Sequence, residues 1–137
     1  MRRSRICNLA GTWRDGRINK VMKKPTESHL IRSCLDLLGM CGIMAWRNNQ
    51  GAIPLPEGGY RRFTGRRGAS DIIGMLPGAR GGGGRFLAIE TKMPGKGRLS
   101  KDQRVFLDEI KANCGLALVV KDLRELADIL REHGYLP

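Results

Sequence analysis

The chain has 137 residues, 41% of them hydrophobic, which is enough for one folded domain and too few for two. No apolar run approaches the roughly 20 residues that span a bilayer, and the first residues lack the apolar core of a secretory signal. We therefore expect no membrane partner. The formal net charge of +12 favours a polyanionic partner such as DNA.

The positive charge is concentrated in two segments. Residues 1–24 carry eight basic side chains and one acid, and residues 47–85 carry seven basic side chains and two acids. We interpret residues 1–24 as a basic N-terminal arm and residues 25–137 as the folded domain. Because four arginines precede the first acid, a transit peptide is the alternative interpretation of the arm.

The first half of the domain is expected to form one helix and one or two strands. Thr26 is a suitable N-cap for a helix whose apolar residues recur at helical spacing up to Cys41. Residues 43–47 have the pattern of a strand, and residues 48–51 that of a turn. Pro54 and Pro56 disfavour regular structure after the turn. Residues 60–63 fit either a short strand or a basic loop.

The second half is expected to contain three strands and two helices. Residues 69–76 and 85–92 form two apolar strands around a glycine-rich connection, and Ser100 begins a helix that ends near Asn113. Residues 116–120 form a continuous apolar strand, and Asp122 caps a last helix. This order predicts a single-domain α/β fold in which helices flank a mixed sheet.

The four cysteines do not form a zinc-binding pattern. Cys7, Cys34, Cys41 and Cys114 include no CxxC pair, and the chain has only two histidines. Cys34 and Cys41 are seven residues apart and would share one helix face, so we interpret them as buried free thiols in a reducing cytoplasm.

Charged residues lie near the ends of the two strands predicted at 69–76 and 85–92. Asp71 lies in the first, and Glu90, Thr91 and Lys92 end the second. Mg²⁺ prefers oxygen ligands and keeps several waters, so Asp71, Glu90 and the Thr91 carbonyl form a candidate metal site. Lys92 projects to the same side of its strand as Glu90 and could orient a water or stabilise charge on a phosphate. The alternative is an ordinary solvated strand end.

Two helical residues are further candidates for this site. Glu27 lies in the first turn of the first helix and shares its apolar stripe, which predicts an inward side chain; the alternative is a helix-dipole glutamate. Gln103 forms a capping box with Ser100 and also lies on the core stripe of its helix. It could position Lys92 or a phosphate.

Basic and amide side chains precede Asp71. They can neutralise phosphates and dock a DNA strand beside the two carboxylates. The candidate nucleic-acid-binding residues are Arg47, Asn48, Arg61, Arg62, Arg66 and Arg67.

Taken in order and spacing, these residues resemble the VRR-NUC domain, the virus-type replication-repair nuclease branch of the PD-(D/E)xK superfamily. The resemblance covers roughly residues 25–130. The matching residues are Glu27, Trp46-Arg47-Asn48-Asn49, Gly51, Gly68, Ser70-Asp71-Ile72, Ile89-Glu90-Thr91-Lys92, Leu99-Ser100 and Gln103. The basic arm and the run of four glycines lie outside the pattern.

The resemblance implies a restriction-endonuclease-like fold and a metal-dependent nuclease. Asp71, Glu90 and the Thr91 carbonyl would hold Mg²⁺ or Mn²⁺, Lys92 would be the catalytic lysine, and Gln103 would complete the site. Glu27 would bind the metal directly or through water. Small stand-alone members of phages and bacteria resemble Holliday-junction resolvases and act as homodimers. The resemblance therefore predicts a cytoplasmic, structure-selective DNA endonuclease for junction or repair substrates.

Two other functions remain open. The first is a nuclease for flaps, single strands or DNA ends. The second is a basic nucleic-acid-binding module that keeps the fold without catalysis.

Overall fold

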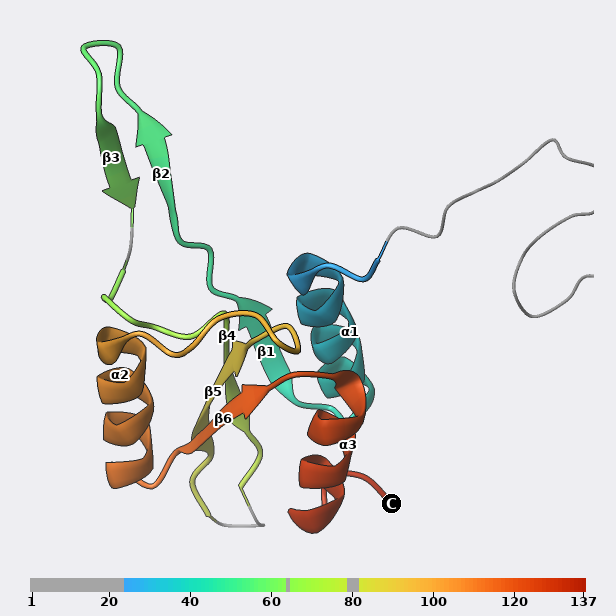
Figure 1. Ribbon diagram of the computed structural model, residues 1–137. Coiled ribbons are helices and arrows are strands. Elements are labelled where there is room, and N and C mark those ends of the chain that lie inside the picture. Colours follow the sequence, from blue (N-terminus) through green and yellow to red (C-terminus); the bar gives the residue numbers. More distant parts are fainter. Residues whose placement is uncertain (1–23, 64, 79–81) are drawn as a thin grey trace, which may run out of the picture.

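A mixed four-stranded sheet with the strand order β1-β4-β5-β6 organises the protein in the computed structural model, which describes residues 24–63, 65–78 and 82–137 (Figure 1). The first three strands of this order pair antiparallel, and β5 pairs with β6 in parallel. The strand bounds are β1 Met44–Arg47, β4 Ile72–Leu76, β5 Arg85–Thr91 and β6 Leu116–Val120.

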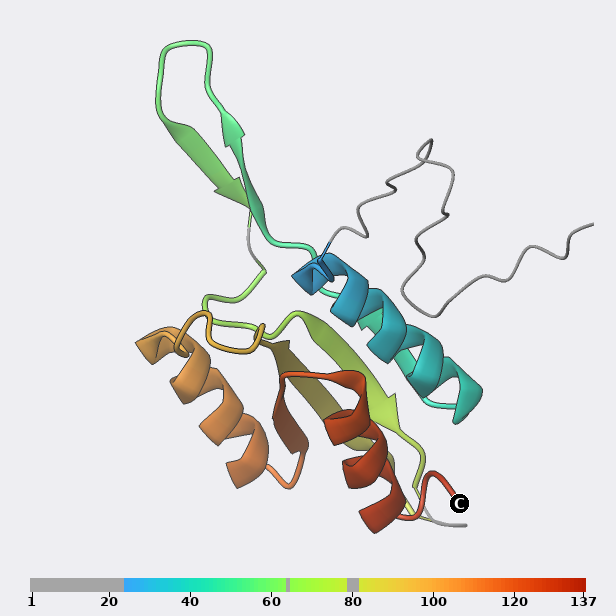
Figure 2. The same cartoon turned by 45° about the vertical axis from the view of Figure 1, so that its right-hand side comes forward.

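Three helices of the described chain cover the two faces of the sheet (Figure 2). They are α1 Glu27–Met40, α2 Lys101–Ala112 and α3 Leu123–Glu132. The helices α1 and α3 pack on one face, where Leu38 and Leu130 join a core with Leu87 and Ile89 of β5. On the opposite face, Phe106 and Leu107 of α2 pack on the small Ala88 and Ala117. Alternate residues of β5 thus serve the two halves of the core, as the pleat of a strand requires.

The predicted single-domain α/β fold with helices on a mixed sheet is confirmed. The helix N-caps are those expected, because the side chains of Thr26, Ser100 and Asp122 each accept a hydrogen bond from the backbone of the first helical turn. The strand at 116–120 has the predicted bounds, whereas β4 begins at Ile72, later than expected.

The expectation of irregular structure around Pro54 was wrong. Two short strands, β2 Gly51–Pro54 and β3 Tyr60–Phe63, form a separate antiparallel hairpin. Pro54 is the last residue of β2, and β2 pairs with β3 along one edge only. The missing N–H of Pro54 therefore breaks no sheet pairing. The predicted arm lies outside the described residues, apart from Lys24.

Two cysteines of the described chain are shielded from water and one is not. Cys34 is buried, as predicted, and Cys41 is partly buried, whereas Cys114 is exposed. This residue ends the turn after α2 with a positive φ of 63°, where the chain reverses at the protein surface. Burial raises the pKa of the Cys34 thiol to about 11, which keeps it protonated and unreactive. Cys7 lies outside the described residues.

Within the described segments, no helix is both long and apolar enough to cross a membrane.

Two glycine-to-alanine substitutions are expected to change stability in opposite directions. At Gly74 of β4 an added Cβ would lie 2.6 Å from the Met44 carbonyl oxygen and 2.9 Å from the Ala45 Cβ, so Gly74→Ala should lower the free energy of unfolding by about 1–3 kcal/mol. At Gly39 in α1 an added Cβ meets nothing within 4 Å, so Gly39→Ala should raise it by about 0.5–1 kcal/mol. Urea denaturation of both variants measures these changes. Equal effects of the two substitutions would contradict the packing of β1 on β4.

Candidate active site

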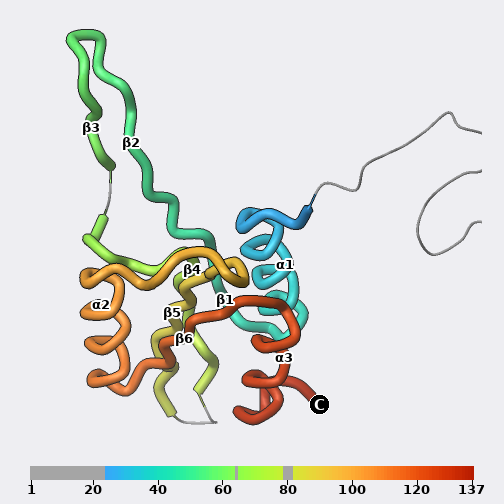
Figure 3. Tube along the Cα trace, in the orientation of Figure 1, coloured from blue at the N-terminus to red at the C-terminus, as the bar shows by residue number. Residues whose placement is uncertain are grey.

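The polar residues predicted from the strand ends meet at one end of the sheet. Because β4 and β5 are antiparallel, with Ile72 opposite Ile89, the start of β4 and the end of β5 lie together. Asp71 directly precedes β4, and Glu90 and Thr91 end β5. The N-termini of α1 and α2 lie at the same end (Figure 3). Two strands and two helices therefore contribute to the candidate site.

Asp71 is held by a pair of hydrogen bonds to Thr91. The Thr91 backbone N–H and hydroxyl both donate to Asp71 Oδ2, each at 2.8 Å. Thr91 is fully buried, so these contacts fix the Asp71 side chain at the end of β5. The structure thus gives Thr91 a positioning role through its side chain. The predicted role of its carbonyl as a metal ligand stays a prediction.

Glu90 is the buried acid of the site. Its side chain is only 2% exposed. One carboxylate oxygen, Oε1, accepts hydrogen bonds from Lys92 Nζ at 2.8 Å and from Gln103 Nε2. The other, Oε2, is buried and has no hydrogen-bond partner in the described chain. A buried acceptor without a partner is costly, so Oε2 is available for a ligand.

The surroundings of Glu90 disfavour its ionised form. Burial raises the pKa of its carboxyl, and the hydrogen bond from Lys92 opposes this rise. The charge of Asp71 raises the pKa further, the charge of Lys92 lowers it, and the charge of Glu27 raises it; the net result is a pKa above the ordinary value of 4.5. Three acids and one lysine therefore act on each other here, and a bound cation would relieve the repulsion among the acids.

The inward orientation predicted for Glu27 was wrong, because its side chain is exposed. The first turn of α1 extends beyond the core, and the helix has no buried residue before Ile31. Glu27 nevertheless lies close enough for its charge to raise the pKa of Glu90. In the described residues no three His, Cys, Asp or Glu side chains form a group that could hold a metal ion. The predicted role of Glu27 in binding the metal, directly or through water, stays a prediction.

Gln103 forms the predicted capping box and also contacts Glu90, whereas its role in positioning Lys92 or a phosphate stays a prediction. Its backbone N–H donates to Ser100 Oγ, and its Oε1 accepts from the Ser100 backbone N–H at 2.9 Å, which completes the capping box. Its Nε2 donates to Glu90 Oε1. The cap of α2 and the buried carboxylate are thus joined through one amide side chain.

The backbone of residues 69–71 is held by hydrogen bonds from Asn48 and Gln50. The Asn48 backbone N–H donates to the Asp71 carbonyl at 2.7 Å, and the Asn48 side-chain Nδ2 donates to the Ser70 carbonyl at 3.1 Å. Gln50 Nε2 donates to the Ala69 carbonyl at 2.6 Å. The contacts of Asn48 position the loop that carries Asp71, and its predicted role in binding nucleic acid stays a prediction. Gln50 was not predicted, although its place in a polar turn just before a strand was the available signal.

The predicted nucleic-acid-binding arginines fall into two groups. Arg66 forms an ion pair with Glu109, and its Cζ lies over the Phe106 ring, 5.5 Å from the ring centroid. Arg67 forms an ion pair with Asp102, with Nε 3.4 Å from Oδ2. These two join the loop before Asp71 to α2. The other three are exposed and have no ion pair within the described part of the chain: Arg47, Arg61 and Arg62.

The residues present suit a hard divalent cation. Asp71 and Glu90 supply carboxylate oxygens at one strand end, and Glu90 Oε2 is a buried acceptor without a partner. Mg²⁺ is commonly held by one or two carboxylates together with waters and substrate oxygens, so the lack of a third acidic ligand is compatible with its binding. Lys92 is 18% exposed and therefore connects the buried carboxylate with the surface.

Comparison with protein-family models, with curated proteins and with solved structures gave no significant match. The assignment of this site therefore depends on its own geometry.

The substitution Glu90→Gln is expected to stabilise the metal-free protein at neutral pH. The pKa of Glu90 is higher in the folded state than its ordinary value of 4.5, so folding disfavours ionisation. The stability cost is absent below pH 4.5, grows as the pH rises through the folded pKa, and is complete above it. Glutamine avoids this cost and keeps an oxygen that can accept from Lys92 and Gln103.

Urea denaturation in a chelator, from about pH 4 to about pH 8, measures this effect. The stability advantage of Glu90→Gln should shrink as the pH falls. The exposed Asp108→Asn on α2 is the matched control, and its difference from the wild type should stay small. A Glu90→Gln protein that is less stable than the wild type at neutral pH would contradict the proposed cost of the buried charge.

Proposed function

We propose that this protein is a metal-dependent endonuclease that hydrolyses phosphodiester bonds in DNA. The observation that carries the proposal is the buried Glu90 carboxylate, whose Oε2 lacks a partner beside Lys92 and Asp71. A purely structural carboxylate at this depth would be expected to have both oxygens satisfied. The basic chain supports a polyanionic substrate.

The chemistry assigns a role to each residue. Asp71 and Glu90 would hold Mg²⁺ or Mn²⁺, which, when bound, lowers the pKa of a coordinated water and offsets charge on the phosphate. The Lys92 ammonium contacts Glu90 and reaches the surface, so it is placed to stabilise negative charge that develops on the reacting phosphate. Gln103 holds Glu90 Oε1 and thereby orients Oε2, and Thr91 orients Asp71.

The finer assignment rests on the resemblance to VRR-NUC nucleases. It comprises a preference for branched DNA, action on Holliday junctions or repair intermediates, and a homodimer that supplies two active sites. Paired incision across a four-way junction requires two active sites, so the junction substrate and the homodimer are proposed together.

Loss of either central side chain should abolish cleavage while DNA binding persists. Glu90→Ala and Lys92→Ala are each expected to slow cleavage by about 100-fold or more, because the first removes a proposed metal ligand and the second removes a positive charge beside the reacting phosphate. Cleavage of labelled DNA in Mg²⁺ or Mn²⁺ measures the rate, and fluorescence anisotropy in a chelator measures binding. Binding should weaken steeply as the salt concentration rises.

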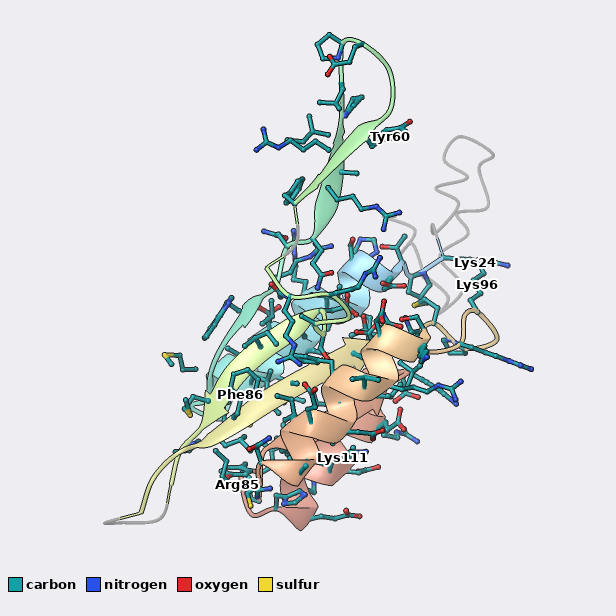
Figure 4. All side chains as sticks on the ribbon, turned by 90° about the vertical axis from the view of Figure 1, so that its left-hand side faces the viewer. Lys24, Tyr60, Arg85, Phe86, Lys96 and Lys111 are labelled. Carbon is teal, nitrogen blue, oxygen red and sulfur yellow. The ribbon has the colours of Figure 1, made fainter. Side chains whose placement is uncertain are left out.

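The matched control for Lys92→Ala is Lys96→Ala, which removes the same charge from an exposed position in the loop after β5 (Figure 4). It should retain near wild-type cleavage. Cleavage that survives Glu90→Ala or Lys92→Ala would refute the mechanism. A wild-type protein that binds DNA and cleaves none of the substrates with either metal would favour the non-catalytic binding module.

A panel of DNA structures tests the substrate preference. Four-way junctions should be cut in pairs of symmetric strands, faster than flaps, single strands, free ends or plasmid duplex. Sedimentation at the concentrations of the assay should show a dimer. Faster cutting of flaps or ends by a monomer would replace the resolvase assignment with an end-processing nuclease.

A further inference from the structure

The hairpin β2–β3 projects from the same end of the protein as the candidate site (Figures 1 and 2). Its strands pair with each other and with no other strand of the described chain. Every residue of β3 is exposed, and in β2 only Gly51 is partly shielded. A two-stranded ribbon on its own is marginally stable in water, so this one is expected to gain stability from a partner.

The ribbon carries apolar and aromatic side chains in water. Ile53 is 56% exposed, Tyr60 71% and Phe63 48%. Phe63 packs on Gly51, where an added Cβ would lie 2.5 Å from the ring, so the base of the ribbon is closed by an aromatic contact. Farther out, Tyr60 lies on the projecting part of the ribbon (Figure 4). Aromatic side chains interleaved with arginines are suited to nucleic-acid surfaces.

The charge of the ribbon favours an anionic partner. Residues 47–67 contain five arginines and a single acid, Glu57. Arg61 lies opposite Ile53 and Arg62 lies opposite Ala52, so the two arginines project from opposite faces of the ribbon. Neither forms an ion pair with any residue that the structure describes. A partner that contacts both faces with negative charge is therefore the best match.

A second copy of this chain fits the ribbon less well. Two ribbons of the same positive charge repel each other. Pro54 also removes a backbone donor from β2, so this strand cannot continue a regular ladder with another strand. Charge and backbone chemistry both favour a polyanion.

The base of the ribbon is fixed to the candidate site. Asn48 and Gln50, which lead into β2, donate hydrogen bonds to the carbonyls of Asp71, Ser70 and Ala69. After β3, Arg66 joins α2 through Glu109 and Phe106. One arm of the ribbon is thus anchored to the backbone at Asp71 and the other to α2, so the position of a ligand on the ribbon is fixed relative to the carboxylates.

The dimensions of the ribbon match the DNA major groove. Two paired strands are about 5 Å apart, and the major groove, about 12 Å wide, admits a two-stranded β-ribbon. The minor groove, about 6 Å wide, is too narrow for the strands together with their side chains. Arginines on both faces would then meet the phosphates on the two sides of the groove.

We infer that the β2–β3 ribbon is a duplex-binding element that inserts into the major groove beside the cleavage site, with Arg61 and Arg62 contacting the two flanking phosphate backbones. The inference deepens the proposed nuclease function and rests on it only for the presence of a cleavage site. The ribbon places duplex DNA relative to Asp71 and Glu90, and Arg66 and Arg67 fix its base to α2.

The test measures duplex binding in a chelator, so its outcome does not depend on cleavage. The double substitution Arg61→Ala/Arg62→Ala is expected to weaken binding of a duplex of about 20 base pairs by 10-fold or more, and to reduce the slope of log affinity against log salt by about 2. Arg61→Lys/Arg62→Lys should retain most of the affinity. Both residues are exposed, so the thermal unfolding midpoint should not change.

The matched control is Lys111→Ala/Arg131→Ala, which removes two positive charges from the last turns of α2 and α3. These turns lie at the opposite end of the sheet from the candidate site (Figure 1). Binding by this control should stay within about 2-fold of the wild type, because phosphate contacts act locally. An equal loss of affinity in the control and the ribbon variant would overturn the inference, because it would indicate a general charge effect.

Groove competition completes the test. Methyl green, which occupies the major groove, should displace the wild-type protein from the duplex, and netropsin, which occupies the minor groove, should not. The reverse result would overturn the assignment of the groove. Unchanged duplex binding by the ribbon variant, or loss of self-association as its only defect, would overturn the inference in favour of a dimer contact. Absent cleavage with intact ribbon-dependent binding would refute the nuclease function alone.

Discussion

The burial of one carboxylate, Glu90, governs the arrangement of this end of the protein. It lies at the end of β5, which is flanked by β4 and β6 and covered by helices, and it is only 2% exposed. Taking a charge out of water costs several kcal/mol unless partners offset it. Lys92 and Gln103 satisfy one oxygen, whereas Asp71 and Glu27 act against ionisation. The neighbouring residues therefore offset the cost of burying this charge only in part.

The helix cap and the strand end depend on each other at this point. The Gln103 side chain accepts from the N-cap of α2 and donates to Glu90, so the start of α2 is fixed relative to the end of β5. Gly68 allows the loop before Asp71 to approach the first turn of α2 closely, because an added Cβ would lie 2.3 Å from the backbone of Asp102. Thr91 holds Asp71 in the same way across β4 and β5. The side chain of Gln103 thus makes both a local capping contact and a long-range contact, and Thr91 makes a second long-range contact.

The sequence predicted those parts of the structure that depend on local chemistry. The N-caps Thr26, Ser100 and Asp122 and the apolar strand at 116–120 follow from short-range propensity and were found as expected. The exposure of Glu27 could not be predicted from helical periodicity, because it depends on how far the first turn of α1 extends beyond the sheet. The contacts of Asn48 and Gln50 depend on tertiary pairing, which a single sequence does not reveal. The strand β3 at 60–63 was one of two alternatives that the sequence left open, whereas β2 was missed because Pro54 and Pro56 made its end look like a loop.

Two energetically unfavourable features lie at the same end of the sheet. One is the buried Glu90 Oε2 without a partner, and the other is a basic ribbon with exposed aromatic side chains. Neither contributes to the stability of the isolated protein, since the first is a desolvated acceptor and the second exposes apolar surface to water. Asn48 and Gln50 connect them through the backbone before Asp71. A single ligand that brings a cation to the carboxylates and a phosphate backbone to the ribbon would offset both features. DNA with a divalent metal has that chemistry.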